Sequence, residues 1–242
     1  MKKTLAALMI APLIFTATAH AAAFTADQEA QVRELVRDTL VKNPEILEEA
    51  IMALQQKQSE KQTAQMKDAV KANADALFND KYTPRIGSKS PKLTIVSFTD
   101  YNCPYCKRFD PQLEAMVKKY PDVAVVFKLL PFKGESSLNA SRAALSVWES
   151  KPEAFAPLHN RLMQKKTALT QDDINNALKT AKAGDVKVTD NSMNTMRMNM
   201  MLAEQLGVQG TPATLIGDVM LPGAVDEAQL DAIIKEQLAK VK

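Results

Sequence analysis

Two cysteines, Cys103 and Cys106, have the clearest capacity for covalent chemistry in this sequence, and they are its only cysteines among 242 residues. Two thiols separated by two residues can form and release a disulfide, or they can together bind a soft metal ion. A disulfide that closes so short a loop removes little chain entropy, so a purely stabilising role is disfavoured. The spacing therefore indicates redox chemistry or metal binding.

Metal binding has one specific form that the sequence leaves open. A zinc site within one chain is excluded, because there is no second cysteine pair and His159 is the only histidine after residue 21. Two thiolates do suit Cu(I), so a copper-binding protein of copper tolerance is an alternative. Methionines that could add soft ligands cluster before Gly207, at Met193, Met196, Met198, Met200 and Met201. Because three of them share a helical face, we interpret this cluster as core packing or as the lining of a peptide groove.

The neighbouring residues place the cysteine pair between a strand and a helix. The β-branched and aromatic run Leu93–Phe98 predicts a buried strand, and the segment from Cys103 to about Lys119 predicts a helix. At a helix N-terminus, the free backbone N–H groups and the helix dipole favour a thiolate over a thiol. We therefore expect Cys103 to be the nucleophile with a lowered pKa. Cys106, one turn into the helix, is expected to be the buried resolving thiol.

Four further residues complete the predicted site. Pro104 suits the first turn of a helix, and Tyr105 is expected to tune the surface and the redox potential rather than to act as an acid or base. Thr211 and Pro212, in the sequence Gly210-Thr211-Pro212, directly precede a predicted strand. An X–Pro bond at this place could be cis, in a turn of the kind that rarely arises by accident.

The remaining pattern predicts an α/β fold with helices inserted midway. Secondary structure is expected in the following segments: a strand at Val123–Leu130, helices from about Ser137 to Leu206, a hairpin of Ala213–Ile216 and Val219–Leu221, and a helix at Asp226–Lys240. Thr170-x-x-Asp173 is a helix-capping pattern. Within these segments we interpret Lys128 as facing solvent or a strand edge, His159 as a surface or capping residue, and Trp148 as part of a helix core.

The N-terminus predicts export. Residues 1–21 combine Lys2 and Lys3 with a short apolar run and the cleavage pattern Ala19-His20-Ala21, which is typical of a signal peptide. An exported protein of this kind is expected in the periplasm. Without Lys2 and Lys3, 29 basic residues face 28 acidic ones, a net charge of +1. This charge gives no electrostatic basis for binding nucleic acid.

Residues 22–80 predict a helical arm ahead of a catalytic domain at residues 81–242. The arm begins with a capping pattern at Thr25-Ala26-Asp27-Gln28, and Asn43-Pro44 is expected to end one helix and to cap the next. Apolar residues recur at helical spacing on both sides of this break. A polar segment at about 55–65, either a solvated helix or a hinge, separates this stripe from the domain. An amphipathic stripe must be buried, either on its own domain or against other copies of the chain. We expect self-association, because the polar segment separates the stripe from the domain that it could otherwise cover.

The segment Phe98–Phe109, together with Gly210-Thr211-Pro212, resembles the DsbA-like family of the bacterial periplasm, which has a thioredoxin fold. The resemblance extends over roughly Lys92–Lys242. The arm, with Asn43-Pro44-Glu45-Ile46 in its middle, is similar to that of the suppressor-of-copper-sensitivity protein C (ScsC) branch. The resemblance implies a thioredoxin fold with a helical insertion at about 136–206, preceded by an oligomerisation arm. It also implies that Thr211 and Pro212 bind the substrate backbone opposite Cys103.

The resemblance implies thiol–disulfide exchange on misfolded or reduced exported proteins. It implies no cofactor beyond the redox-active Cys103–Cys106 disulfide, and a membrane-bound thiol reductase as the electron donor. One position departs from the family: DsbA-like oxidases carry a buried acidic residue six positions before the first cysteine, where this chain has Ser97. The role of the nearby Asp100 stays unassigned. We therefore favour a disulfide isomerase or reductase over an oxidase, with an inert-disulfide scaffold or chaperone as a further alternative.

Overall fold

The structure is a computed structural model that describes residues 24–241, so the predicted signal peptide lies outside the described residues. The chain divides into two compact units, one ending at Ser59 and the other comprising Glu60–Lys242. The first unit contains helix α1 (Ala26–Lys42) and the first part of helix α2 (Glu45–Ala72), and neither helix has a buried residue. Within the described part of the chain, no helix combines the length and the apolar character that crossing a membrane requires.

The helix caps in the arm match the predicted ones only in part. The predicted capping box at Thr25 is confirmed, since the Thr25 hydroxyl accepts from the Gln28 N–H and the Gln28 side chain accepts from the Thr25 N–H. Asn43 ends α1, as expected, but its side chain caps this helix and not the one that follows. Its side-chain amide and its backbone N–H both donate to the Thr39 carbonyl, each at 2.9 Å. The polar segment 55–65 is helical throughout, as part of α2.

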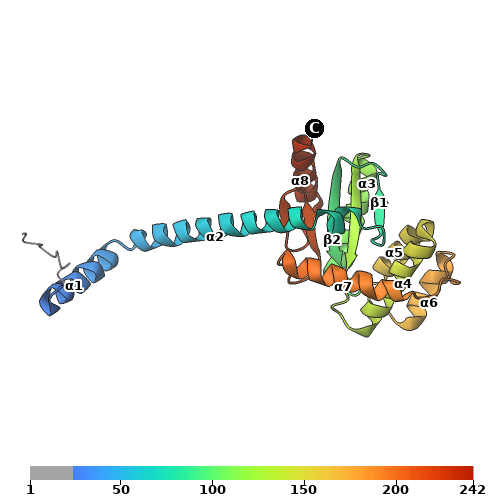
Figure 1. Cartoon of the computed structure of the whole chain (residues 1–242), viewed down its shortest axis with the longest axis horizontal. Helices are drawn as coiled ribbons and strands as arrows, with labels where there is room; N and C mark the ends of the chain where they lie inside the picture. Colours follow the sequence, from blue (N-terminus) through green and yellow to red (C-terminus); the bar gives the residue numbers. More distant parts are fainter. Residues whose placement is uncertain (1–23, 242) are drawn as a thin grey trace, which may run out of the picture. The chain divides into compact units, whose positions relative to one another are not determined.

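The second unit is built on a five-stranded sheet with the order β1-β3-β2-β4-β5 (Figure 1). The central strands β2 and β3 pair in parallel, and every other pair is antiparallel. The bounds of the strands are β1 Arg85–Gly87, β2 Leu93–Thr99, β3 Val123–Leu129, β4 Ala213–Ile216 and β5 Val219–Leu221. The predicted hairpin is confirmed. This is the thioredoxin-like sheet that the family resemblance implied.

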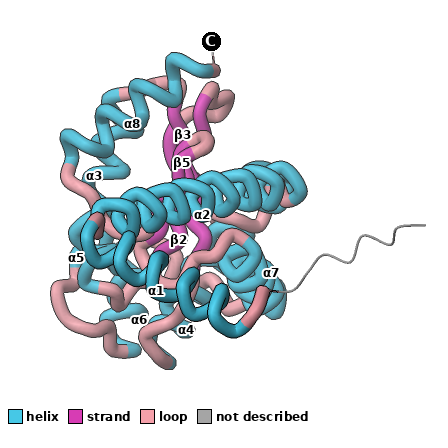
Figure 2. Tube along the Cα trace, turned by 90° about the vertical axis from the view of Figure 1, so that its left-hand side faces the viewer, coloured by secondary structure: helices cyan, strands magenta, loops and turns pink. Residues whose placement is uncertain are grey.

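Both faces of the sheet are covered by helices, which explains why nearly every residue of its central strands is buried. Ile95 and Phe127 point into the core shared with α3 (Pro104–Lys119) and α8 (Glu227–Lys240). Val96 and Phe98 point to the other face, against the end of α7 (Asp190–Gln205). In Figure 2 the strands (magenta) accordingly lie between α3 and α8 on one side and α7 on the other.

The expected helical insertion lies between β3 and β4. Its elements are α4 (Glu135–Ser150), η2 (Pro152–Ala154), α5 (Phe155–Gln164), α6 (Gln171–Thr180) and α7. The predicted cap of α6 is confirmed, because Thr170 and Asp173 form a reciprocal capping box. Trp148 is half-buried on α4, where its ring packs edge-on against Phe155 and its indole N–H donates to the Lys81 carbonyl at 2.9 Å.

The sequence pattern did not predict two short elements. The π-helical turn η1 (Asp75–Asn79) follows α2, and the edge strand β1 pairs with β3. Gly87 ends β1 with a φ of 95°. A side chain there would collide with the Val123 carbonyl and with Val117, so this close approach of the strands requires glycine.

Lys128 was expected to face solvent or a strand edge, but it is fully buried on β3. Its ammonium group donates to the Ala76 carbonyl and to the Thr83 hydroxyl, each at 2.7 Å, and lies 3.8 Å from the Asp80 carboxylate. The sequence pattern could not reveal this, because the acceptors come from a segment about 50 residues away. The buried lysine joins the end of the α2–η1 region to the sheet.

Burial lowers the pKa of Lys128 to about 8, against the opposing effect of Asp80. An unfolded lysine titrates near 10.4, so between these values the unfolded chain binds more protons than the folded one. The contribution of Lys128 to the free energy of unfolding must therefore rise with pH across this window.

The prediction concerns the free energy of unfolding of wild type minus that of Lys128→Met. We expect this difference to be about 2 kcal/mol larger at pH 10 than at pH 7. Urea unfolding at both pH values measures it. The exposed Lys92→Met variant is the control. Parallel pH profiles for wild type and Lys128→Met would contradict the buried titration.

Candidate active site

Both cysteines lie where α3 begins, and both are thiols in this structure. Cys103 is the N-cap residue of α3 in an extended conformation, and Pro104 occupies the first helical turn. The side chains are nearly enclosed, with exposed fractions of 2% for Cys103 and 1% for Cys106. The backbone N–H of Cys103 donates to the Asp100 carbonyl at 3.1 Å, which fixes the loop from β2 into the helix.

Two opposing effects act on the Cys103 thiol. Burial raises its pKa, but the hydrogen bonds made by the Cys106 backbone, by the Thr211 side chain and by the Cys106 side chain lower it. The net pKa of Cys103 is lowered. A lowered thiol pKa was predicted for the cysteine at the helix N-terminus, and Cys103 shows it.

Cys106 shows the reverse balance. Burial raises its pKa to about 12, and the hydrogen bonds at Thr99 and the Asp100 backbone only partly oppose this. Of the two thiols, Cys103 therefore ionises first, while Cys106 keeps its proton. This asymmetry suits a nucleophile and a resolving partner.

The peptide bond between Thr211 and Pro212 is cis, as the sequence pattern suggested. The loop that carries it faces the cysteines, and the Cys103 thiol donates to the Thr211 carbonyl at 3.2 Å. Residues that are more than one hundred positions apart in the sequence are thus brought together. Thr211 is half-buried and Pro212 is buried at the start of β4.

A groove of about 630 Å³ opens over Cys103. Two of its aromatic side chains are exposed, Tyr105 at 59% and Phe132 at 44%. The Tyr105 ring carries Arg108 over its face, 4.6 Å from the ring centroid. The lining residues are Cys103, Pro104, Tyr105, Phe132, Lys133, Gln209, Gly210 and Thr211. Sequence reasoning missed Phe132 and Lys133, because a loop after Pro131 gives no sign of which strand end it approaches.

Asp100, whose role the sequence left open, is completely buried and fixes the active-site loop. Its carboxylate accepts from the backbone N–H groups of Asn102 at 2.8 Å and Lys133 at 2.9 Å, and from the Ser137 hydroxyl at 2.6 Å. These bonds tie the cysteine loop to the groove wall and to the start of α4. Asp100 is therefore a positioning residue.

His159 was expected at the surface or at a helix cap, but it is completely buried in α5. Its Nδ1 lies 2.9 Å from the Tyr101 hydroxyl and its Nε2 lies 3.0 Å from the Asp110 carboxylate. The sequence held no signal for this cluster, since the three side chains come from three separate segments. Ser97, the departure from the family pattern, is buried in β2.

The methionine cluster on α7 is divided between core and surface. Met196 is buried and Met193 packs against the core, whereas Met198, Met200 and Met201 are about half exposed. Met200 therefore departs from the buried face that its spacing predicted. Among the described residues, no group of three or more His, Cys, Asp or Glu side chains is arranged to hold a metal ion.

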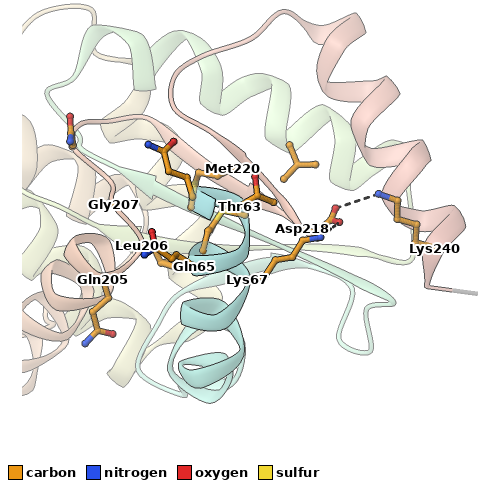
Figure 3. Close-up of a pocket in the computed structure, with 13 residues that line it drawn as sticks. Thr63, Gln65, Lys67, Gln205, Leu206, Gly207, Asp218, Met220 and Lys240 are labelled. Carbon is orange, nitrogen blue, oxygen red and sulfur yellow. Dashed lines mark hydrogen bonds and ion pairs between the residues drawn. The ribbon is translucent and has the colours of Figure 1, made fainter. Parts of the chain in front are cut away.

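A larger cavity of about 870 Å³ lies in the second unit, between the later part of α2, the end of α7 and β5 (Figure 3). Asp218 bridges two lysines there, with its oxygens 3.4 Å from the Lys67 ammonium and 3.3 Å from the Lys240 ammonium. The cavity is lined by amides, aliphatic chains and this ion pair, without a thiol. The groove at Cys103 is therefore the candidate active site.

Comparisons with known proteins match both parts of the chain. Residues 79–236 match the family model described as thioredoxin, and residues 28–61 match the model of the copper resistance protein ScsC N-terminal domain. Proteus mirabilis ScsC in a compact conformation is 61% identical, with a TM-score of 0.72 over 88% of this chain and 99% of that chain. A periplasmic thioredoxin-like protein from Salmonella enterica serovar Typhimurium is 57% identical, with a TM-score of 0.68 over 69% and 95%.

A more distant relative has a named activity. Disulfide bond formation protein D of Bacillus subtilis is 25% identical over 177 residues, which are 65% of this chain and 78% of that protein. A buried thiol pair at a helix N-terminus, facing a cis-proline loop, accounts for such an activity in physical terms. With its thioredoxin-like domain and its matching N-terminal segment, this chain belongs to the ScsC family of DsbA-like proteins and is a thiol–disulfide oxidoreductase.

Proposed function

We propose that this protein is a periplasmic disulfide isomerase and reductase, with Cys103 as nucleophile and Cys106 as resolving thiol. The Cys103 thiolate attacks a substrate disulfide, forms a mixed disulfide with one substrate sulfur and releases the other as a thiolate. In isomerisation, another substrate thiolate attacks the mixed disulfide and regenerates Cys103. In reduction, Cys106 loses its proton, attacks Cys103 and releases the second substrate thiolate, which leaves the Cys103–Cys106 disulfide.

The opposite pKa directions of the two thiols are the observation that carries the catalytic assignment. Cys103 lies in the groove and is the better leaving group, because its pKa is the lower of the two. Cys106 stays protonated until the mixed disulfide forms. We assign substrate binding to Thr211 and Pro212, because the Thr211 carbonyl already lies 3.2 Å from the Cys103 sulfur. An extended substrate segment can pair with this loop while its cysteine reaches Cys103.

The N-terminal arm supports isomerase over oxidase. Nearly all residues of α1 and of the first part of α2 are exposed, including these large apolar side chains: Val32, Leu35, Val36, Val41, Ile46, Leu47, Ile51, Met52 and Leu54. Such a stripe gains stability by packing against other copies of itself. A homo-oligomer would place several Cys103 grooves around one misfolded substrate, which favours repeated exchange.

A resting isomerase must keep Cys103 reduced. After a reductive turnover, the Cys103–Cys106 disulfide needs two electrons and two protons, and we assign their supply to a membrane-bound thiol reductase. The periplasm is the proposed compartment, in keeping with the predicted signal peptide and with the periplasmic Salmonella relative. The substrates are then misfolded or incorrectly oxidised exported proteins.

Introducing a charge into the stripe tests the oligomer. We expect Leu35→Glu in the full mature chain to lower the mass in solution to that of a monomer, because a buried carboxylate in the interface is costly. Light scattering measures the mass, and refolding of a scrambled disulfide substrate measures isomerisation. Gln31→Glu, on the same helix, is the control. A wild-type monomer, or an isomerase rate unchanged by dissociation, contradicts the proposal.

The alternative is a Cu(I)-binding protein of copper tolerance, which the match to the copper resistance ScsC N-terminal domain favours. The two thiols of Cys103 and Cys106 are the soft donors that Cu(I) prefers. This alternative predicts one tightly held Cu(I) per cysteine pair, measured by competition with a chromogenic chelator, and slow exchange on scrambled substrate. Weak Cu(I) binding together with fast exchange would exclude it.

A further inference from the structure

The cavity between the later part of α2, the end of α7 and β5 adjoins the groove over Cys103 (Figure 3). Gln209 lines both hollows, and it is two residues before Thr211, whose carbonyl lies 3.2 Å from the Cys103 sulfur. The lining continues to Asp218, in the turn between β4 and β5, and all of it belongs to the second unit. A substrate segment that leaves Cys103 past Gln209 therefore enters this cavity.

The cavity lining offers hydrogen-bonding groups that the protein itself does not use. Four exposed glutamines contribute to it: Gln62 and Gln65 on α2, Gln205 at the end of α7, and Gln209 in the loop that follows. Within residues 24–241, none forms a hydrogen bond with these four side-chain amides. Each amide has two N–H donors and one carbonyl acceptor, which complement a peptide backbone whatever its side chains are.

The edge of the sheet adds backbone groups to the same cavity. β5 is the last strand in the sheet order, so among the described residues no strand pairs with its outer side. Val219 and Met220 both line the cavity, although the side chains of successive strand residues point to opposite faces. The cavity therefore borders the free edge of β5. The unpaired N–H and C=O groups of an edge strand are a template for an extended chain.

The walls of the cavity are held in place by the fold. Met66 on α2 packs against the core cluster that contains Leu206. The neighbouring Lys67 ammonium lies 3.4 Å from the Asp218 carboxylate, which also pairs with Lys240 at 3.3 Å. Because these contacts already fix α2 beside β5, a bound chain does not have to order the wall.

The length of β4 sets how much of a substrate the cavity can hold. Gln209 precedes the start of this strand and Asp218 follows its end, so the cavity extends along the whole strand. β4 has four residues, which at 3.3 Å per residue is a length of about 13 Å. An extended substrate segment therefore needs about four residues to reach the far end.

We propose that this cavity is a second binding site for the polypeptide substrate. It holds about four residues of extended chain on one side of the substrate cysteine, through backbone hydrogen bonds to the glutamine amides and to the edge of β5. The occupant is an unfolded segment of an exported protein. The inference rests on thiol–disulfide exchange at Cys103, and it extends that function because recognition of the backbone suits substrates of any sequence.

The rate of reduction of peptides of increasing length tests this site in the wild-type mature protein. The probes contain one cysteine in a mixed disulfide with glutathione and carry one to six added alanine or serine residues on its N-terminal or its C-terminal side. The Cys103 thiolate attacks the peptide sulfur and releases glutathione thiolate, and Cys106 then displaces the peptide thiolate and leaves the Cys103–Cys106 disulfide. Mass spectrometry follows the released glutathione.

We expect the second-order rate constant to rise about tenfold between one and about four added residues and then to level off. This is the gain that one or two net hydrogen bonds supply. The rise should occur on one side of the cysteine only, because the cavity lies on one side of Cys103. A rate independent of length on both sides, or an equal rise on both, overturns the inference.

Filling the cavity provides the matched variants. Thr63→Trp places a large ring in it, whereas Ala64→Trp changes the next exposed residue of α2, which does not line the cavity. Thr63→Trp should remove the gain, so that long and short peptides react at similar rates, and Ala64→Trp should keep it. The length series on wild type stands by itself if either variant does not fold.

Light scattering on the same variants tests a different occupant, a second copy of this chain. If Thr63→Trp changed the mass in solution and left the length dependence intact, the cavity would be an interface between copies and the inference would be wrong. Failure of the proposed function has a separate signature, which is that even the shortest peptide is not reduced.

Discussion

Cys103→Ser is expected to reduce the rate of disulfide exchange by more than about a thousandfold, because a serine hydroxyl stays protonated at neutral pH. The reduced pair owes its reactivity to Cys103, because hydrogen bonds from the Cys106 backbone and the Thr211 side chain lower the pKa of this thiol, whereas burial raises the pKa of Cys106. Scrambled-substrate refolding and reduction of a small disulfide both measure the loss.

Cys106→Ser is the matched variant, and its expected behaviour is different. Cys103 still attacks substrate, but the mixed disulfide can no longer be released by Cys106. Mixed disulfides should therefore accumulate and be visible on a non-reducing gel, and reductase turnover should stop. If Cys103→Ser formed mixed disulfides and Cys106→Ser did not, the two assigned roles would have to be exchanged.

Asp100→Ala is expected to destabilise the protein by about 3 kcal/mol or more, because each buried donor that loses its partner costs roughly 1–3 kcal/mol. Three donors depend on this carboxylate: the Ser137 hydroxyl, which is buried, and the N–H groups of Asn102 and Lys133, which are partly buried. Exchange activity should fall as well, since the same bonds hold the cysteine loop against the groove wall.

Urea unfolding provides the stability change for Asp100→Ala. Asp122→Ala is the control, because Asp122 lies in a turn where its carboxylate is 52% exposed and pairs with Lys92. A substitution there should change stability by less than about 0.5 kcal/mol. Equal effects of the two substitutions would show that the Asp100 network does not stabilise the fold.

The sequence predicted the features that rest on local physics. The strand before Cys103, the helix after it and the cap at Thr170 depend on residue type and spacing within one segment, and the structure confirms them. The cis bond at Pro212 was suggested because an X–Pro bond can be cis, and because this one precedes a strand in a chain that also has a Cys-x-x-Cys pair between a strand and a helix. The pairing of Thr211 with Cys103 came from the family resemblance, because no local pattern links positions so far apart.

The errors share one physical cause, which is that partners from distant segments decided the outcome. Lys128 and His159 look like surface residues in their own segments, but acceptors from η1 and from α3 allow them to be buried. The short edge strand β1 exists because β3 offers it a partner. Asn43 can cap either neighbouring helix, and its side chain bonds back to Thr39.

The reactivity of Cys103 towards an alkylating reagent as a function of pH is the most direct test of the active-site account. Mass spectrometry of the reduced protein follows alkylation at each cysteine separately. We expect Cys103 to react with a midpoint below the value near 8.5 of a free thiol, and Cys106 to stay unmodified throughout the neutral range. A midpoint for Cys103 at or above 8.5, or faster alkylation of Cys106, would contradict the account.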